Sequence, residues 1–348
     1  MRIRKILLMI PKKFLLKKIY NLMIYYLSRK FKYHYLFFKP IVMDIEPTTG
    51  CNFRCTMCQV SSENFVAKNL DLKLFKKVIV ENQQLIKIKL QGMGEPLINK
   101  NFHEMVSFAN KFGIAVEFVT NGSLLTRENI NKLSDNLLST ISISIDGATK
   151  ETFENIRVKS NFDVVIANVK NLINHFKSKK NKTEIKALSL IQKKNFHEIE
   201  NITKICKDLG FDNLAFQVQM TGWGKEEWEN INKAQDINYS KLDKDYFLKI
   251  LKKYNSKSFK AEVITDNILS FKKQCSYPYE NPYLSANGKI VPCCMIADDA
   301  VVNFGSVSEY SFSKIWNSKD YQDFRKGIKQ NIIKNFCKNC YKEFRIEQ

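Results

Sequence analysis

The stretch Thr49-Gly50-Cys51-Asn52-Phe53-Arg54-Cys55-Thr56-Met57-Cys58 carries three cysteines that are separated by three and by two residues. It follows a short apolar run at 41–46, so we expect the cysteines to lie on the loop after a strand. Three thiolates can bind three irons of a 4Fe–4S cluster and leave the fourth iron open to a further ligand. The alternative is a zinc site with a distant fourth ligand, which this spacing disfavours because zinc sites favour C-x₂-C pairs.

The chain around this stretch alternates between β-rich and helix-like segments. The six β-rich runs lie at 41–46, 86–91, 114–119, 139–145, 184–190 and 214–219, and the helix-like segments lie at 72–82, 102–111, 126–136, 161–177 and 196–208. Repeated βα units predict a parallel sheet, which right-handed crossovers wind into an open or closed barrel. The chemistry of such barrels lies at the carboxyl ends of the strands, where the cysteine stretch falls. We therefore expect an α/β fold.

The cysteine stretch and the motifs after it resemble the radical S-adenosylmethionine (SAM) superfamily, and residues 41–225 are similar to its partial (βα)₆ barrel. Gly92-Met93-Gly94-Glu95-Pro96, after the second β-rich run, resembles the family's Gly-Gly-Glu-Pro motif. The resemblance implies that Gly94 and Glu95 hold the amino group of SAM. Glycine lets a backbone approach a ligand closely, and a carboxylate pairs with an ammonium group. Met57 falls where the family places an apolar residue near the adenine.

Three polar residues near the fourth β-rich run extend the resemblance. Ser144 and Asp146, in Ser-Ile-Asp-Gly, resemble the segment that contacts the ribose and the carboxylate of SAM. Arg157 falls where many members place an arginine for the SAM carboxylate. The alternative for these residues is a turn cap or a solvated surface charge.

Four further cysteines, Cys275, Cys293, Cys337 and Cys340, are separated by 17, 43 and 2 residues. Together with a hairpin signal at Asn287-Gly288, they resemble the shortened SPASM, or twitch, domain that carries one auxiliary 4Fe–4S cluster. A structural zinc on the same cysteines is the alternative, because four thiolates suit both metals. Of the two remaining cysteines, Cys206 lies in a helical pattern and is expected to be a buried apolar residue.

Cys294 directly follows one of the predicted auxiliary ligands. In sulfatase-maturating relatives an aspartate follows the corresponding ligand and accepts a proton, but this chain has no acid there. Epimerising members of the group use a thiol to donate a hydrogen atom to a carbon radical. We therefore consider Cys294 a candidate catalytic donor, with simple packing as the alternative.

The net charge of +21 is concentrated near the N-terminus. Residues 1–40 contain eleven basic residues and no acid, and subtracting these charges leaves +10 for the other 308 residues. Apolar residues from Leu15 to Leu27 recur at helical spacing, with Lys17 and Lys18 on another face, so we expect a basic amphipathic helix. It could dock on an anionic membrane surface, or pack on the protein with a solvated lysine face. Specific binding of nucleic acid is not expected, because no aromatic-basic RNA module follows.

These features divide the chain into four parts: a basic N-terminal extension (1–40), a radical SAM core barrel (41–225), a helical connector (226–272) and a SPASM/twitch domain (273–348). Clustered cysteines indicate metal binding in a reducing compartment, so we expect a cytoplasmic protein, peripheral at the membrane if the helix docks there. The longest apolar run in the N-terminal extension, Leu22 to Leu27, is too short to span a bilayer.

The resemblance implies an enzyme that reductively cleaves SAM and uses the 5′-deoxyadenosyl radical to abstract a hydrogen atom. We expect it to oxidise or epimerise a carbohydrate or another small polar metabolite, in surface glycan or lipid-linked biosynthesis. A reducing partner such as flavodoxin or ferredoxin would supply the electron. The alternatives are a peptide or protein maturase of the SPASM type and a non-enzymatic metal protein that binds nucleic acid.

Overall fold

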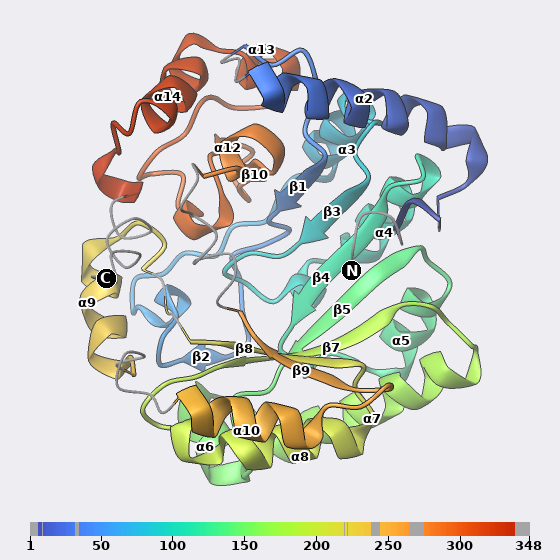
Figure 1. The fold of residues 1–348 in the computed structure, drawn as a ribbon, viewed down its shortest axis with the longest axis vertical. Coiled ribbons are helices and arrows are strands. Elements are labelled where there is room, and N and C mark those ends of the chain that lie inside the picture. The colour runs from blue at the N-terminus through green and yellow to red at the C-terminus, as the bar shows by residue number, and fades with distance from the viewer. Residues whose placement is uncertain are drawn as a thin grey trace.

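A nine-stranded sheet forms the centre of the computed structural model, which describes residues 6–8, 10–31, 35–218, 220, 222–237, 244–264 and 275–337. The strands, in spatial order, are β11 (Ile290–Val291), β10 (Tyr283–Leu284), β1 (Val42–Ile45), β3 (Lys87–Leu90), β4 (Ala115–Thr120), β5 (Leu138–Ser144), β7 (Glu184–Leu190), β8 (Asn213–Gln217) and β9 (Lys260–Val263). All neighbouring pairs from β10 to β9 are parallel, and β10 and β11 are antiparallel. The six predicted strands and the α/β fold are confirmed (Figure 1).

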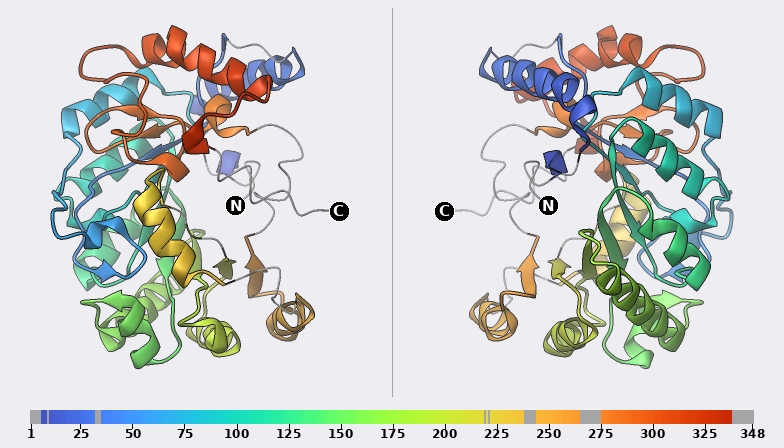
Figure 2. Two further views of the ribbon diagram at one scale, coloured as in Figure 1. Left: turned by 90° about the vertical axis from the view of Figure 1, so that its left-hand side faces the viewer. Right: turned by 90° about the vertical axis from the view of Figure 1, so that its right-hand side faces the viewer.

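Helices surround this curved sheet, and most of them lie on its outer side (Figures 1 and 2). They are α2 (Lys12–Phe31), α3 (Leu72–Glu81), α4 (Phe102–Lys111), α5 (Arg127–Ser134), α6 (Lys150–Ile156), α7 (Phe162–Ser178), α8 (Ile199–Leu209), α9 (Glu226–Gln235), α10 (Lys244–Tyr254), α12 (Tyr277–Glu280), α13 (Phe312–Trp316) and α14 (Lys319–Lys329). Side-chain caps set several helix starts; Asp71, for example, accepts hydrogen bonds from the backbone N–H groups of Lys73 and Leu74 at the start of α3. The inner face of α3 then buries Phe75, Val78 and Ile79 against the sheet.

The segment expected to be a helical connector also contributes a strand. β9 pairs in parallel with β8 and extends the sheet by one strand beyond the six predicted. Its four residues, Lys-Ala-Glu-Val, include two charged side chains, and this is why hydrophobic patterning did not reveal it. The two-residue strands β2 (Arg54–Cys55) and β6 (Arg157–Val158), which pair with each other, were also missed.

The C-terminal region joins the same sheet. β10 pairs in parallel with β1, with Asp44 opposite Tyr283 and Ile45 opposite Leu284. The predicted hairpin at 287–291 is present, because β10 and β11 pair on either side of it. Residues 283–291 therefore form one edge of the barrel sheet.

The N-terminal helix α2 lies at the amino ends of the strands. Lys17 and Lys18 contact Gln83, and Lys18 also donates to the backbone carbonyl of Leu85, just before β3 begins. Contrary to the expectation of a solvated lysine face, Lys18 is completely buried. Among the described residues, no helix has both the length and the apolar character needed to cross a membrane.

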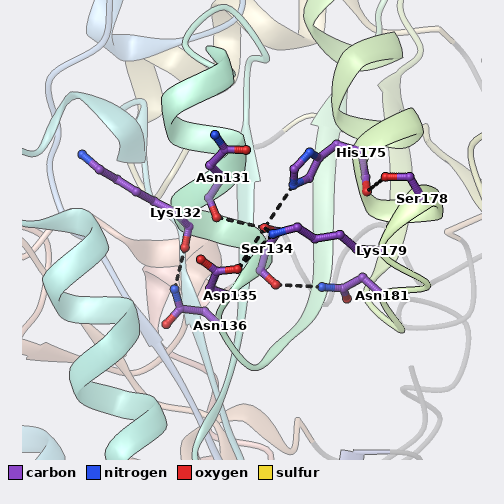
Figure 3. Close-up of polar contacts among 9 residues, drawn as sticks. All are labelled: Asn131, Lys132, Ser134, Asp135, Asn136, His175, Ser178, Lys179 and Asn181. Atoms are coloured by element: carbon purple, nitrogen blue, oxygen red, sulfur yellow. Dashed lines mark hydrogen bonds and ion pairs between the residues drawn. The ribbon is translucent and has the colours of Figure 1, made fainter.

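A polar cluster ties α5 to α7 at the same end of the barrel (Figure 3). The Oγ atom of Ser134 lies 2.8 Å from Lys179 Nζ and 3.1 Å from His175 Nε2, and the Ser134 carbonyl accepts from Asn181 Nδ2 at 3.0 Å. These groups close the ends of two helices that lead into β5 and β7. The cluster is therefore structural and lies away from the carboxyl ends of the strands.

Candidate active site

A cavity of about 350 Å³ opens at the carboxyl ends of the barrel strands. This volume is at the small end of the range for ligand sites. Its lining includes the motif residues Cys51, Cys55, Met57, Cys58, Gly94, Glu95, Ser144, Asp146 and Arg157, together with Cys294 from the C-terminal region. The structure thus brings all the residues predicted for the first cluster and for SAM to one cavity.

The cysteine loop is fixed by short backbone contacts. Cys55 lies in β2 opposite Arg157 of β6, and Cys58 N–H donates to the Cys55 carbonyl at 3.1 Å. The Cys51 sulfur accepts from Phe53 N–H at 3.4 Å. Burial raises the pKa of all three thiols, to about 11 for Cys55 and about 12 for Cys58. Three sulfur ligands on one cavity wall fit a cluster with one open iron, and metal binding would displace their protons.

The Gly92–Pro96 motif packs directly on the cysteine loop. Glu95 N–H donates to the Gly50 carbonyl at 2.8 Å. A Cβ atom on Gly94 would lie 2.7 Å from the Thr49 carbonyl carbon and closer still to the oxygens of Thr48 and Gly50. Only glycine fits at this position, because the obstructing atoms belong to the backbone. Gly94 therefore fixes the distance between the motif and the three cysteines.

The Glu95 carboxyl group is buried and held by three donors. It accepts from Thr120 Oγ1 at 2.8 Å, from Asn121 N–H at 2.7 Å and from Leu97 N–H at 3.3 Å. Burial nevertheless raises its pKa to about 7. A cationic partner, such as the amino group of SAM, would stabilise the ionised form of this buried carboxyl group.

Asp146 and Arg157 form an ion pair inside the cavity wall. Arg157 Nη2 lies 2.6 Å from Asp146 Oδ2, and Arg157 Nη1 lies 3.9 Å from the Cys55 sulfur. Asp146 Oδ1 also accepts from Leu190 N–H at 2.8 Å. Neither residue is a solvated surface charge, so the structure excludes that alternative. Ser144, at the end of β5, is buried and lines the same cavity.

The predicted auxiliary ligands are described in part. Nearby Cys294 and then burial raise the pKa of the Tyr277 phenol, with smaller contributions from Asp44, Cys293 and Cys275. Burial raises the pKa of the Tyr321 phenol, and Cys293 and Cys275 add to this effect. Cys337 ends a short 3₁₀ helix (Asn335–Cys337), and Cys340 lies outside the described residues. Within the described ranges, no three Cys, His, Asp or Glu side chains are placed to hold a single metal ion.

Cys294 is brought into the cavity by the hairpin that pairs with β1. Burial, and then the nearby Asp44 carboxyl, raise the pKa of its thiol to about 12. Lys89 Nζ lies 3.8 Å from Oδ1 of the same Asp44 carboxyl. Tyr283, Ala297 and Trp223 pack around Cys294. The thiol therefore remains protonated near neutral pH.

The sequence analysis missed Asn121, which lines the cavity, and Glu46, which lies behind the Gly92–Pro96 motif. Asn121 follows β4 in Thr120-Asn121-Gly122, a turn signal that could have been noticed. It donates to Asn52 Oδ1 at 2.9 Å and lies 3.9 Å from the Cys51 sulfur. Glu46, after β1, accepts from the N–H groups of Met93 at 2.9 Å and Ala286 at 3.1 Å. Glu46 thus joins the Gly92–Pro96 motif to the C-terminal hairpin, which no sequence signal indicates.

A second, wider hollow of about 590 Å³ lies beside α6 and is lined by residues such as Thr149, Lys194 and Glu198. Glu198 there accepts hydrogen bonds from Ala148 N–H at 2.6 Å and Thr152 Oγ1 at 2.8 Å, so it caps the helix. None of the cysteines lines this hollow. The smaller cavity is therefore the candidate active site.

Two family models match this chain. The radical SAM superfamily model matches residues 45–185, and the model of the SPASM iron–sulfur cluster-binding domain matches residues 275–341. Together they cover more than half of the sequence. The chain belongs to the radical SAM superfamily and carries a C-terminal SPASM domain. It is therefore a radical SAM enzyme whose cofactors are SAM and 4Fe–4S clusters.

Curated relatives differ in what they make. The AdoMet-dependent heme synthase of Methanosarcina barkeri is 27% identical over 322 residues, which cover 86% of this chain and 88% of that protein. The mycofactocin maturase MftC of Mycolicibacterium smegmatis is 27% identical over 195 residues, 56% of this chain and 48% of that protein. This chain therefore spans most of the first relative and about half of the second.

Solved structures share the fold. SuiB of Streptococcus suis bound to its precursor peptide SuiA superposes with a TM-score of 0.62 at 14% identity, covering 85% of this chain and 68% of that one. The structure of anSMEcpe with bound AdoMet gives a TM-score of 0.58 at 19% identity, covering 88% of both chains. At these identities the likeness extends to the fold alone.

Proposed function

We propose that this enzyme abstracts a hydrogen atom from a small polar metabolite, such as a carbohydrate, and then oxidises or epimerises the resulting carbon radical. The observation that carries the proposal is the single cavity that contains the three motif cysteines, Glu95 and Cys294. The residues proposed to bind the first cluster and SAM line this cavity together with the Cys294 thiol. Epimerisation needs the substrate to lie between the SAM site and this thiol, whereas oxidation does not use the thiol.

We assign the residues as follows. Cys51, Cys55 and Cys58 bind the first cluster, and Cys275, Cys293, Cys337 and Cys340 bind the auxiliary cluster. When bound, the clusters supply the electron that cleaves SAM and a nearby one-electron acceptor. Gly94 and Glu95 hold the SAM amino group, Met57 contacts the adenine, and Ser144, Asp146 and Arg157 position the ribose and the carboxylate.

The lining of the cavity supports a small polar substrate. Beyond the SAM residues it presents the amide side chains of Gln91, Gln217 and Asn232 and the ring of Trp223. Amides donate and accept hydrogen bonds without charge, which suits hydroxyl groups. A cavity of about 350 Å³ must also hold SAM, so only a small reacting group fits beside it.

A peptide maturase is the second candidate function, because relatives such as the mycofactocin maturase MftC carry that name. A maturase of this type would need a peptide-binding segment before the barrel. Residues 12–31 instead form a helix at the amino ends of the strands, away from the cavity. This placement favours the small metabolite.

We further propose a cytoplasmic location, since iron–sulfur clusters and thiols need a reducing compartment. A flavodoxin or ferredoxin would then be the electron donor. A nucleic-acid role is disfavoured because much of the excess charge belongs to the N-terminal segment and not to the cavity.

The test uses anaerobically reconstituted protein with SAM and a reductant in D₂O. Panels of sugars, sugar nucleotides and peptides are compared by how far each raises 5′-deoxyadenosine formation above the substrate-free rate. An epimerised product carries one solvent deuterium at the reacting carbon, because the radical regains a hydrogen atom from an exchangeable thiol. An oxidised product has lost an electron and a proton there and carries no solvent deuterium.

The variant Cys294→Ala separates the two outcomes. An epimerase variant would still form 5′-deoxyadenosine but would not form the epimer, whereas a dehydrogenase variant would keep its product. Cys206→Ala is the matched control, because Cys206 is fully buried in α8 and does not line the cavity. Iron content is checked first, since Cys294 neighbours the proposed ligand Cys293. Stimulation by peptides alone would overturn the small-metabolite proposal.

A further inference from the structure

The helix α2 packs on the protein through an inner face that mixes polar side chains with apolar ones of the core. Lys18 donates to the carbonyls of Gln83, at 2.8 Å, and Leu85. Asn21 exchanges two hydrogen bonds of 2.9 Å with the backbone of Lys39. The inner face also buries Leu22, Tyr25 and Ser28, and Tyr25 bonds to Glu280. These positions recur every three or four residues, so they occupy one side of the helix.

The outer face of α2 is apolar. We define it as Leu16, Ile19, Tyr20, Met23, Tyr26 and Leu27, which are exposed by 83%, 42%, 67%, 59%, 61% and 58%. At 3.6 residues per turn these side chains lie on the side opposite Lys18 and Tyr25. Apolar side chains therefore occupy both sides of α2, whereas the usual amphipathic surface helix has a single apolar stripe that faces the core.

The exposed apolar residues of the protein concentrate in this region. Among the described residues nineteen large hydrophobic side chains are exposed, and nine of them lie between Leu8 and Phe37. Scattered exposed hydrophobic residues are normal, but a contiguous patch marks an interaction site. The same segment carries eleven basic residues and no acid in residues 1–40. Lys12, Lys13 and Lys17 are exposed along the first turns of α2.

We propose that the outer face of α2 binds the surface of an anionic lipid bilayer. Leucine, methionine and tyrosine side chains enter the boundary between headgroups and acyl chains, while the flanking lysines pair with anionic headgroups. Charge complementarity identifies this occupant. A second copy of the chain would bring two strongly basic segments together, which like-charge repulsion opposes. The proposal concerns this surface alone and is independent of the reaction in the cavity.

The exposed outer face of α2 also explains how the enzyme could bind lipid without unfolding. The contacts of Lys18, Asn21, Leu22 and Tyr25 hold α2 to the protein, so the exposed outer face is available while α2 stays docked. Figure 2 shows α2 at the periphery, beside α14 and clear of the central strands. Insertion of its side chains therefore requires no rearrangement of the barrel.

The test is co-sedimentation of the full-length, cluster-loaded protein with two kinds of vesicle. One contains phosphatidylcholine alone, and the other contains phosphatidylcholine with phosphatidylglycerol. We expect the partition coefficient to be at least about tenfold higher on the anionic vesicles and to fall as salt is added. Met23→Glu should lower binding to the anionic vesicles by about tenfold or more, because it places a carboxylate on the inserting face.

The matched control is Leu248→Glu, on α10, where the replaced side chain is 60% exposed against 59% for Met23. This variant adds the same charge elsewhere and should bind like the unaltered protein. Iron content and unfolding midpoint should be unchanged in both variants. Equal binding to the two vesicles, or unaltered binding by Met23→Glu, would overturn the proposal. So would light scattering that shows a dimer which Met23→Glu converts to monomer, because a second copy would then cover this face.

Discussion

Two nitrogens of the Arg157 guanidinium group contact the same carboxylate oxygen of Asp146. Nη2 lies 2.6 Å and Nε lies 2.8 Å from Oδ2. Asp146 is completely buried, and Arg157 belongs to the strand that pairs with Cys55. The pair therefore links the end of β5 to the cysteine loop. Its loss would leave an arginine charge in the cavity wall without its partner.

From this geometry we expect Asp146→Ala to lower the free energy of unfolding by about 3–5 kcal/mol, the usual cost of breaking a buried pair. Urea unfolding followed by circular dichroism measures the change. Asp135→Ala is the control, because Asp135 pairs with Lys179 at 3.1 Å on the surface, where water screens the interaction (Figure 3). Equal stability of the two variants would show that the buried pair contributes nothing.

A second prediction concerns SAM affinity. Glu95→Gln should weaken SAM binding to the reconstituted enzyme by about tenfold to a hundredfold, since a charge-assisted hydrogen bond contributes about 1.5–3 kcal/mol. Because the pKa of Glu95 is raised to about 7, affinity of the unaltered enzyme should also fall as pH drops below about 7, where the carboxyl becomes protonated. Calorimetric titration gives both values.

Glu198→Gln is the matched control for this measurement. Glu198 is also a buried carboxylate, at 4% exposure, but it caps α6 outside the cavity. Its replacement should leave SAM affinity unchanged. If Glu95→Gln bound SAM as tightly as the unaltered enzyme, Glu95 would not belong to the SAM site.

The third prediction follows from Glu46. Burial raises the pKa of this carboxyl from 4.5 to about 7, so the folded protein holds a proton that the unfolded chain releases. Its contribution to stability is complete below about pH 4.5 and is lost as pH rises through about 7. In metal-free protein, the free energy of unfolding should therefore fall over this interval, by up to about 1.4 kcal/mol per pH unit for this group.

Replacing the titrating carboxyl isolates its effect. Glu46→Gln should lessen the slope of this pH dependence, which urea unfolding at several pH values records, while Glu95, whose pKa is also raised to about 7, keeps its own contribution. Glu128→Gln should not flatten it, because Lys132 lowers the pKa of the exposed Glu128. Parallel profiles for the unaltered protein and Glu46→Gln would mean that Glu46 is ionised throughout.

A fourth prediction uses two glycines of neighbouring loops. Gly94→Ala should displace the cysteine loop, because its Cβ would meet backbone atoms of Thr48, Thr49 and Gly50. The bound iron should fall by about half, from about eight to about four per chain, as measured by iron and sulfide analysis. Gly50→Ala is the control, since its Cβ would lie 3.3 Å from Thr48 Oγ1 and 3.4 Å from Ala67 Cβ, which small shifts relieve. Full iron content in Gly94→Ala would refute the close packing described here.

The central strands could be predicted because their signal is local. All seven residues of β5 are buried, and its continuous run of Ile, Ser, Thr and Leu, without a charged residue, is typical of a buried strand. The spacing of the three cysteines is also a local signal. It predicted a site on the loop that follows the first strand, where Cys51 lies. Because the crossovers between parallel strands are right-handed, the carboxyl ends of the strands were expected to lie at the same end of the barrel.

Contacts between distant segments could not be predicted. β10 has two residues, too few to show a period, and its pairing with β1 places Tyr283 opposite Asp44 across a long separation in sequence. The burial of Lys18 could not be predicted from the sequence either. It depends on the backbone carbonyls of Gln83 and Leu85, which lie between α3 and β3, whereas hydrophobic periodicity treats every lysine as solvated.

The position of α2 determines the direction from which substrate reaches the enzyme. α2 contacts residues that precede β3 and β4, such as Leu85 and Gly113, whereas the cavity is lined by residues that follow those strands, such as Gln91 and Asn121. Strands of four and six residues separate the two ends by about 13–20 Å. An enzyme bound to a bilayer through α2 would therefore turn its cavity toward the aqueous phase. Water-borne sugars could enter directly, while a headgroup in the same bilayer would have to extend past the whole barrel.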